Sequence, residues 1–213
     1  MQTTRLLPVA LNVQGKRCLI VGGGHVAARK AQSLVECDAR IIVIAPQLIE
    51  PFPVSEAHII HVPRPYEAGD CAGFTLVFAC TDDSAVNAAV AAEATKLGIL
   101  HNVVDDAEVS DFHAAATVRR GDICIGITTR GGSPALARHL KSRVEECVGS
   151  EFEQLLDIMS TRRAAVKAGI EQQSVRAAAW AAVLESDVLE LLKAGERERA
   201  EMLVDELLQL ANK

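Results

Sequence analysis

Three consecutive glycines at 22–24 separate a short apolar run from a segment with helical spacing, and this arrangement limits the possible folds more than any other part of the chain. The mostly apolar run 18–22 predicts a buried strand, and the apolar residues that recur every three or four positions after the glycines predict a helix. A second apolar run at 41–45 predicts the next strand. We therefore expect residues 16–45 to form one strand–helix–strand unit with parallel strands.

Gly22, Gly24 and Ala27 of this unit form the pattern G-x-G-x-x-A. Gly22 permits a tight turn, Gly24 lets a pyrophosphate approach the backbone, and Ala27 allows the helix to pack closely on the strand. The N-terminus of the helix then offers N–H groups and the positive end of its dipole to the phosphates. Such a pattern alone marks a turn more often than a cofactor site, but the flanking strands and helix favour a dinucleotide site.

One part of the usual dinucleotide site is missing. An acidic residue normally holds the adenosine ribose at the end of the second strand, but the chain has Ala45-Pro46-Gln47 there. We therefore expect the ribose contacts to come from backbone groups and from Gln47. Because no Lys or Arg lies nearby to bind a 2′-phosphate, the sequence favours NAD over NADP.

Length and composition limit the remaining possibilities. The 213 residues allow one domain with an appendage or two small domains. No apolar run reaches the length of a membrane span, residues 1–16 lack signal-peptide features, and the six cysteines are scattered without C-x-x-C pairs. We predict a cytoplasmic protein with buried thiols, no membrane contact and no residue assigned to a metal site. The net charge of −6 argues against nucleic-acid binding.

Strand and helix patterns alternate up to residue 111. The expected strands after the first unit are 58–62, 75–80 and 99–104, with a proline-broken connection at 46–56 and a helix at 84–97 that Asp82 or Asp83 caps. This alternation predicts an α/β fold with a Rossmann-like, doubly wound parallel sheet. Its ligand cleft should lie where three loops meet at the carboxyl ends of the strands: 22–25, 81–83 and 102–106. The apolar lead-in 6–11 is expected to pack on an edge of the sheet.

The pattern changes after residue 111. Two strands, 114–119 and 123–129, are predicted to form a hairpin, which needs a cover such as a partner subunit because isolated hairpins are marginally stable. A helix at 135–148 follows, with Ser133 as N-cap and Pro134 in its first turn. The rest reads as helices 152–167, 174–184, 186–193 and 197–210. We expect an NAD-binding Rossmann-like domain (1–111), a small α+β region for dimerisation and substrate binding (112–149) and a C-terminal helical domain (150–213).

Two features suggest chemistry. Asp105 follows a strand expected to be central, so its carboxylate is well placed to accept a proton in the cofactor cleft, although it could instead cap a turn. Basic residues are concentrated within an acidic chain between Phe112 and Arg143, where Asp122 is the one acidic residue. This patch suits an anionic ligand, but on a helix it could equally be a solvated face.

Several phrases occur in order at suitable distances: LPVALNVQGKRCLIVGGGHVAARKA, LVFACTDD, HNVVDD, Phe112 and TTRGGSPALARHLKSRVEE. Together they resemble precorrin-2 dehydrogenase, the dehydrogenase module of siroheme synthase, over roughly residues 5–148. The resemblance implies NAD-dependent oxidation of precorrin-2 to sirohydrochlorin by a homodimer. Some relatives also insert ferrous iron, so a bifunctional dehydrogenase and ferrochelatase is one alternative. A domain that binds NAD without turnover, as a sensor, is another.

The resemblance also implies roles for residues. Asp105 matches the aspartate to which the proton is thought to pass. A polycarboxylate tetrapyrrole would be bound by basic residues, of which we select Arg130, Arg138 and Lys141. His113 departs from the family pattern and could bind iron, but a packed or solvent-facing histidine is the commoner case. The residues assigned to the cofactor are Gly22, Gly24, His25, Val26, Pro46, Gln47, Thr81, Asp82, Asn102 and Val103.

Overall fold

The computed structural model describes residues 5–53 and 58–210, and residues 54–56 of the predicted connection at 46–56 lie outside this range. The chain divides between Ala114 and Ala115 into two compact units. The first unit contains a parallel sheet, and the second contains a hairpin and five helices.

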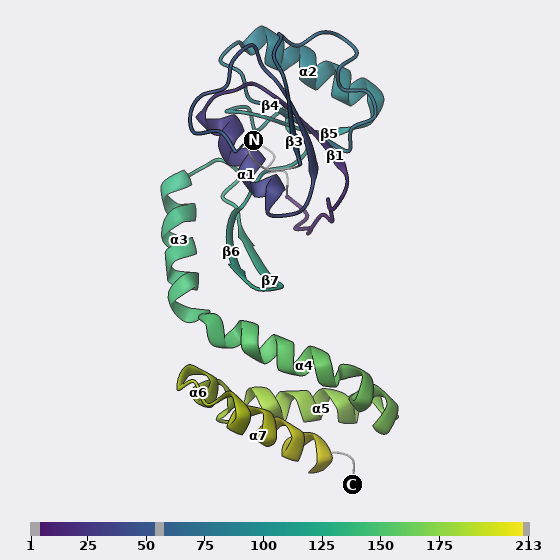
Figure 1. Ribbon diagram of the computed structural model, residues 1–213, viewed down its shortest axis with the longest axis vertical. Coiled ribbons are helices and arrows are strands. Elements are labelled where there is room, and N and C mark those ends of the chain that lie inside the picture. Colours follow the sequence, from purple (N-terminus) through teal and green to yellow (C-terminus); the bar gives the residue numbers. More distant parts are fainter. Residues whose placement is uncertain (1–4, 54–57, 211–213) are drawn as a thin grey trace. The chain divides into compact units, whose positions relative to one another are not determined.

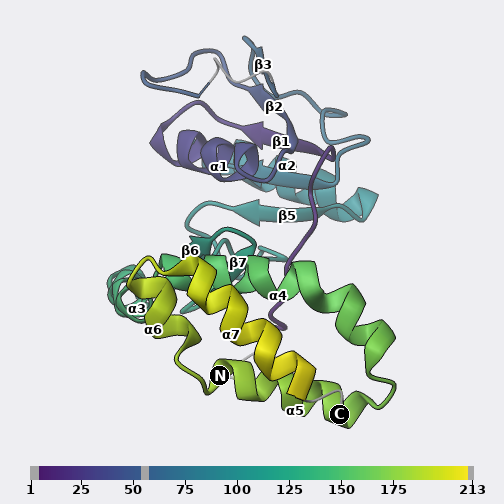
Figure 2. The same ribbon diagram turned by 60° about the horizontal axis from the view of Figure 1, so that its bottom comes forward.

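The first unit is a five-stranded parallel sheet with strand order β3-β2-β1-β4-β5. Figure 2 shows β3, β2 and β1 in succession, with β5 beyond β1. Its strands are β1 (Arg17–Val21), β2 (Arg40–Ile44), β3 (Ile59–Val62), β4 (Leu76–Ala79) and β5 (Leu100–Val103). Helices α1 (His25–Val35) and α2 (Ser84–Leu97) lie on opposite faces of this sheet (Figure 1). The predicted doubly wound, Rossmann-like α/β fold is confirmed.

The core of this unit has two layers because the central strands are buried on both faces. Ile20 and Phe78 point to the α1 face, where they pack with Ala27 of the helix. Leu19 and Val77 point to the opposite face, where they pack with residues of α2. Burying an Ile, Leu or Val side chain fully contributes about 1.5–3 kcal/mol, so these continuous apolar strands stabilise both layers.

The strand register brings three loops together at the carboxyl ends of the strands, which form one edge of the sheet. Val21 of β1 pairs with Ala79 of β4, and Ala79 pairs with Val103 of β5. The hydrogen-bond ladder continues beyond the strands, because Cys80 N donates to Val21 O at 2.7 Å and Val104 N donates to Ala79 O at 2.9 Å. The chain leaves β1 and β4 toward opposite sides of the sheet, which makes this edge the switch point where doubly wound folds bind ligands.

The position of β5 corrects one expectation. The strand that leads to Asp105 was expected to be central, but β5 is an edge strand of the described sheet. The chain turns after Val104 and returns along the outer edge of β5 without forming another strand. Asp105 therefore lies at a corner of the sheet.

The apolar lead-in is a second correction. Residues 5–12 form no strand and are exposed, with 82% of Leu7 and 65% of Val9 accessible, so they do not pack on the sheet as expected. A turn just before β1, in which Lys16 N donates to Val13 O at 2.9 Å, directs this segment away from the sheet.

The second unit begins with the predicted hairpin. Strands β6 (Ala116–Arg120) and β7 (Ile123–Ile127) are antiparallel and joined by a two-residue turn in which Gly121 has φ +53°. A Cβ atom on Gly121 would lie 2.7 Å from Cγ of Glu153, so α4 (Ser150–Gly169) packs closely against the turn. The chain's own helices therefore supply part of the cover that we expected from a partner.

Helix α3 (Pro134–Cys147) begins as predicted, because Ser133 Oγ accepts a hydrogen bond from Leu136 N at 3.1 Å. Four helices follow: α4, α5 (Gln173–Leu184), α6 (Val188–Lys193) and α7 (Arg197–Leu210). They pack side by side around Leu155, Ile158 and other apolar residues (Figure 1). Arg162 of α4 binds both carboxylate oxygens of Asp205 on α7, which lowers the pKa of that carboxyl. Among the described residues, no helix has the length and apolar character needed to cross a membrane.

Candidate functional site

The glycine turn after β1 contains two positions that require glycine and one that is open. A Cβ atom on Gly22, whose φ is +124°, would lie 2.4 Å from the carbonyl oxygen of Cys80. A Cβ atom on Gly23 would lie 2.0 Å from the carbonyl oxygen of Gln47. Nothing lies within 4 Å of the Cβ position of Gly24. The turn is therefore packed against its neighbours on two sides and open at Gly24.

The open side is also the N-terminus of α1. Gly24 is the N-cap of this helix, and the first turn has neither a side-chain cap nor an acidic residue. By contrast, Asp83 caps α2 and Ser133 caps α3. The first N–H groups of α1 thus have no side-chain cap, and the space beside the N-cap glycine is open, which is an arrangement that binds a phosphate. The turn fits the pyrophosphate of a dinucleotide.

The other residues predicted around this turn lie close to it in the fold. His25 and Val26 form the first turn of α1, and Pro46 and Gln47 follow β2 at the same edge of the sheet. Ile49 N donates to Gly23 O at 2.9 Å and holds the segment after β2 against the glycine turn. His25, Pro46 and Gln47 are exposed, so their side chains are accessible to a ligand.

The loop after β4 is closed by its own side chains. Asp83 Oδ1 accepts from Ala85 N at 2.8 Å and from Val86 N at 3.3 Å. Asn87, which is buried, accepts from Thr81 N and Thr81 Oγ1 and donates to Thr81 O at 2.9 Å. The polar groups of Thr81 are therefore engaged within the chain, whereas Asp82 is exposed. The role of Asn87 was not predicted, although a single asparagine in an alanine-rich helix is a signal that the sequence offers.

At the end of β5, the predicted cofactor residues face a neighbouring segment. Asn102 Nδ2 donates to Phe112 O at 2.9 Å, and Val103 N donates to Ser110 Oγ at 2.9 Å. Both residues are buried. Asp105 is exposed and has φ +60°. The use of Asn102, Val103 and Asp105 by a ligand stays a prediction.

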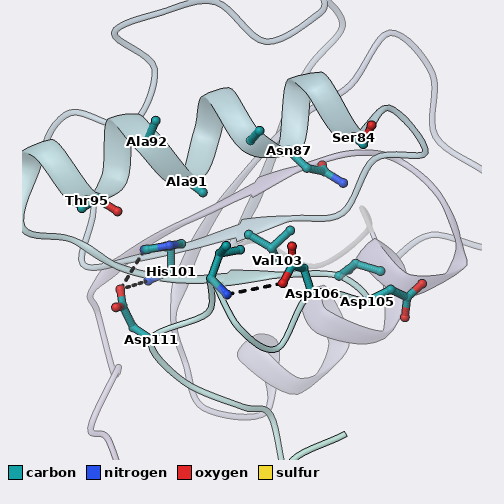
Figure 3. Close-up of a pocket in the computed structure, with 13 residues that line it drawn as sticks. Ser84, Asn87, Ala91, Ala92, Thr95, His101, Val103, Asp105, Asp106 and Asp111 are labelled. Carbon is teal, nitrogen blue, oxygen red and sulfur yellow. Dashed lines mark hydrogen bonds and ion pairs between the residues drawn. The ribbon is translucent and has the colours of Figure 1, made fainter. Parts of the chain in front are cut away.

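A pocket of about 620 Å³ lies between α2 and the segment that follows β5 (Figure 3). Ser84 and Asn87 line it from α2, and Asp105 and Asp106 line it from the end of β5. Figure 3 shows Asp105 at the opposite end of the pocket from the pair formed by His101 and Asp111. His101 Nδ1 lies 2.7 Å from Asp111 Oδ2, but out of line for a well-formed hydrogen bond.

Burial shifts the pKa of two groups on the α1 face of the sheet. It raises the pKa of the Cys80 thiol to about 12, so this cysteine beside the glycine turn remains protonated and is a poor nucleophile. Burial also lowers the pKa of Lys30, whose Nζ lies 5.8 Å from the centre of the Phe78 ring. Both the thiol and the amine are therefore adapted to an apolar environment.

The predicted substrate residues belong to the second unit, whereas the glycine turn and Asp105 belong to the first. Arg130 precedes α3 with φ +53°, and Arg138 and Lys141 lie on α3. Lys141 Nζ lies 3.6 Å from Glu145 Oε1. Arg138 is exposed and has no carboxylate partner among the described residues. Whether these residues serve the same site as Asp105 stays a prediction.

No group of three or more His, Cys, Asp and Glu side chains within residues 5–53 and 58–210 is arranged to hold a metal ion. His113 is half-buried just before the boundary between the units. Its proposed role toward iron stays a prediction.

Comparisons with known proteins agree with this architecture. A family model described as "Putative NAD(P)-binding" matches residues 9–116, and a second model, "Sirohaem synthase dimerisation region", matches residues 151–208. The second match lies after the region 112–149 that we expected to form the dimer contact. The location of that contact stays a prediction.

Full-length relatives and one solved structure extend the comparison. The chain is 37% identical over 207 residues to a siroheme synthase of Methylococcus capsulatus and 37% identical over 199 residues to one of Chromobacterium violaceum. The matches cover 93% and 92% of this chain but 42% of each relative, so the chain spans less than half of their length. A structure of "SirC, precorrin-2 dehydrogenase" has the same fold, with a TM-score of 0.74 and 19% identity over 94% of this chain and 100% of that one. The chain therefore belongs to the NAD(P)-binding family whose model covers just over half of it, and the relation to siroheme synthase that its sequence predicted is confirmed.

Proposed function

We propose that this chain oxidises precorrin-2 to sirohydrochlorin with NAD as hydride acceptor, and that Asp105 accepts the proton. Membership of the NAD(P)-binding family supports the cofactor. The similarity to siroheme synthases, together with the fold shared with a protein named precorrin-2 dehydrogenase, supports the substrate and the reaction.

The observation that carries the proposal is the alignment of the open glycine turn with Asp105 along one edge of the sheet. The register Val21–Ala79–Val103 puts Asp105 two strands away from the turn, at the same height. Neighbouring strands are separated by about 4.8 Å, so the lateral distance is roughly 10 Å. The sugar and nicotinamide half of a dinucleotide can span this distance, with its pyrophosphate at the glycine turn.

Each part of the chain then has a distinct task. Gly24 and the first N–H groups of α1 bind the pyrophosphate, and Gln47 with nearby backbone groups binds the adenosine ribose. Bound NAD supplies a two-electron acceptor for a hydride. Asp105 takes the proton that leaves the macrocycle, so loss of one hydride and one proton accounts for both hydrogens removed.

The second unit supplies positive charge for a polycarboxylate substrate. Arg130, Arg138 and Lys141 are the proposed contacts, and the unpaired state of Arg138 among the described residues supports its availability. Lys141 must exchange Glu145 for a substrate carboxylate. We further propose a homodimer, since the dimerisation model matches residues 151–208.

The test is Asp105→Asn, assayed by the absorbance change on mixing protein, precorrin-2 and NAD without oxygen. We expect oxidation to fall by at least about 100-fold, within the range lost with a general base, while the Kd for NAD stays within about twofold. Asp106→Asn is the matched control, because Asp106 Oδ1 accepts from the backbone N–H groups of Glu108 and Val109 and an amide oxygen preserves that role. Full activity of Asp105→Asn would remove Asp105 as the base.

Insertion of ferrous iron by the same chain stays a separate proposal. An anaerobic assay with sirohydrochlorin and ferrous ion, in the absence of NAD, measures it directly. Metal insertion in that assay would identify a bifunctional enzyme. If NAD binds but neither reaction occurs, a sensor function is indicated.

A further inference from the structure

The segment 104–112 runs along the outer edge of β5 without forming a strand. Its side chains, instead of a strand backbone, accept hydrogen bonds from N–H groups of β5. Ser110 is the first link. Its hydroxyl oxygen accepts from Val103 N at 2.9 Å and donates to Asp106 O at 2.6 Å. One side chain thus joins the last residue of β5 to the far side of the turn that contains Asp105.

Asp111 is the second link, one step further along the edge. Asp111 N donates to His101 O at 2.9 Å, and Asp111 Oδ2 accepts from His101 N at 3.1 Å. The His101 ring, with 5% of its side chain exposed, lies beside the same carboxylate. The segment is therefore anchored below the turn by Asp111, and Ser110 adds a side-chain bridge to the turn's own backbone bond, from Asp106 N to Val103 O at 3.4 Å.

The position of the Asp105 side chain is set by its backbone, because no contact from the described part of the chain holds its carboxylate. Its carboxylate has no hydrogen-bond or ion-pair partner among the described residues, and its backbone has φ +60°. The left-handed conformation is uncommon for a residue other than glycine and persists where the surroundings impose it. The contacts on either side of Asp105 include the ladder bond of Val104 N to Ala79 O, the turn bond of Asp106 N to Val103 O at 3.4 Å and the Ser110 bridge.

We propose that Ser110 is a positioning residue for Asp105, which rests on the function proposed above: its hydroxyl bridge between Val103 N and Asp106 O sets where the Asp105 carboxylate stands at the end of β5. Loss of the hydroxyl leaves a buried N–H of Val103 without an acceptor, and the turn shifts to find one. Displacement of a catalytic group by about 1 Å can reduce a rate by about 100-fold. Ser110 itself need not touch the substrate.

A purely structural role for Ser110 gives a different result. The hydroxyl also shields an edge strand from pairing with other chains, as edge strands require. Were that its whole role, Ser110→Ala would lower the unfolding temperature or the solubility of the protein and leave kcat unchanged below that temperature. Separate measurements of kcat, KM and the Kd for NAD distinguish the two roles, because only a positioning role lowers kcat while NAD binding is kept.

The experiment compares Ser110→Ala and Ser110→Thr with the wild-type chain in the anaerobic precorrin-2 assay. For Ser110→Ala we expect kcat to fall about 10- to 100-fold, with the Kd for NAD within about twofold of wild type, because the glycine turn lies two strands away. Ser110→Thr retains the hydroxyl and is expected to keep kcat within about threefold. Hydrogen exchange of the Val103 amide should become faster in Ser110→Ala and remain slow in Ser110→Thr.

Ser33→Ala is the matched control, since Ser33 also lies in the first unit and its hydroxyl bonds the Arg29 carbonyl at 3.1 Å within α1. It should keep kcat. A wild-type kcat in Ser110→Ala would overturn the positioning role and leave the proposed function intact. A parallel loss of NAD affinity and kcat would also overturn it, because the hydroxyl would then serve the predicted cofactor residues Asn102 and Val103, or the fold as a whole, and not Asp105 in particular. A wild-type chain that oxidises no precorrin-2 would overturn the proposed function itself.

Discussion

The N-termini of α1 and α2 follow neighbouring strands at the same edge of one sheet, yet the chain treats them in opposite ways. At α2, Asp83 caps the first turn and Asn87 ties the loop to Thr81. At α1, Gly24 offers no side chain and the first turn carries no acidic residue. The difference indicates that α2 is stabilised by its own sequence, whereas α1 leaves its free N–H groups for a ligand phosphate.

The largest expected effect comes from adding a side chain at Gly22, where the glycine turn is packed against Cys80. Gly22→Ala puts a Cβ atom 2.4 Å from the Cys80 carbonyl oxygen at φ +124°. Strain and overpacking together should reduce the free energy of unfolding by roughly 2–6 kcal/mol. Urea unfolding followed by circular dichroism measures the loss, and the fluorescence of Trp180, the single tryptophan, reports the second unit separately. Wild-type stability would show that the turn is not packed as described.

The next effect comes from giving α1 the kind of cap that α2 has. Gly24→Asp is sterically allowed, because nothing lies within 4 Å of the Cβ position and φ is −84°. The unfolding free energy should rise by about 0.5–1 kcal/mol, since aspartate caps the helix and complements its dipole. NAD affinity should fall on the order of 100-fold, because the carboxylate occupies the N–H groups and repels the pyrophosphate.

Gly24→Asn separates the two causes of that loss. Asparagine caps about as well as aspartate but carries no charge, so its loss of NAD affinity should be smaller than that of Gly24→Asp. Isothermal titration calorimetry gives both Kd values. Unchanged NAD binding in both variants would mean that the dinucleotide does not use the N-terminus of α1.

The sequence predicts those features of the two helix N-termini that depend on residues close together in the chain. The glycine turn, the α2 range 84–97 and the cap by Asp82 or Asp83 were predicted because each depends on residues within a few positions. The bounds of α2, Ser84–Leu97, agree with that prediction. Local chemistry therefore determined the ends of α2.

The features that escaped prediction depend on distant parts of the chain. Nothing near Asp105 indicates that β5 is an edge strand, since this follows from the number and order of all strands. The bond from Val103 N to Ser110 Oγ crosses seven positions and forms only because the chain returns along that edge. Likewise, whether Arg130, Arg138 and Lys141 act together with Asp105 depends on the assembly of two units, and it stays a prediction.

The next effect comes from removing the buried Asn87 amide, which ties the loop before α2 to the helix. Asn87→Ala leaves the backbone N–H and carbonyl of Thr81 without their side-chain partner. The free energy of unfolding should fall by about 2–3 kcal/mol, toward the upper end of the cost of unsatisfied buried polar groups. Asn87→Asp keeps an acceptor for Thr81 N, and urea unfolding should place it between Asn87→Ala and wild type. Equal stability of all three would show that the Thr81 loop does not depend on this amide.

The smallest expected effect comes from removing Asp83, the N-cap of α2. Asp83→Ala removes the acceptor for Ala85 N and Val86 N, which should cost about 1 kcal/mol of unfolding free energy, whereas Asp83→Asn should remain within a few tenths of wild type. The Kd for NAD should stay within about twofold in both variants, because the pyrophosphate is expected at α1. If Asp83→Ala weakens NAD binding tenfold or more while Asp83→Asn does not, the N-terminus of α2 also belongs to the cofactor site, and the two helix ends differ in degree and not in kind.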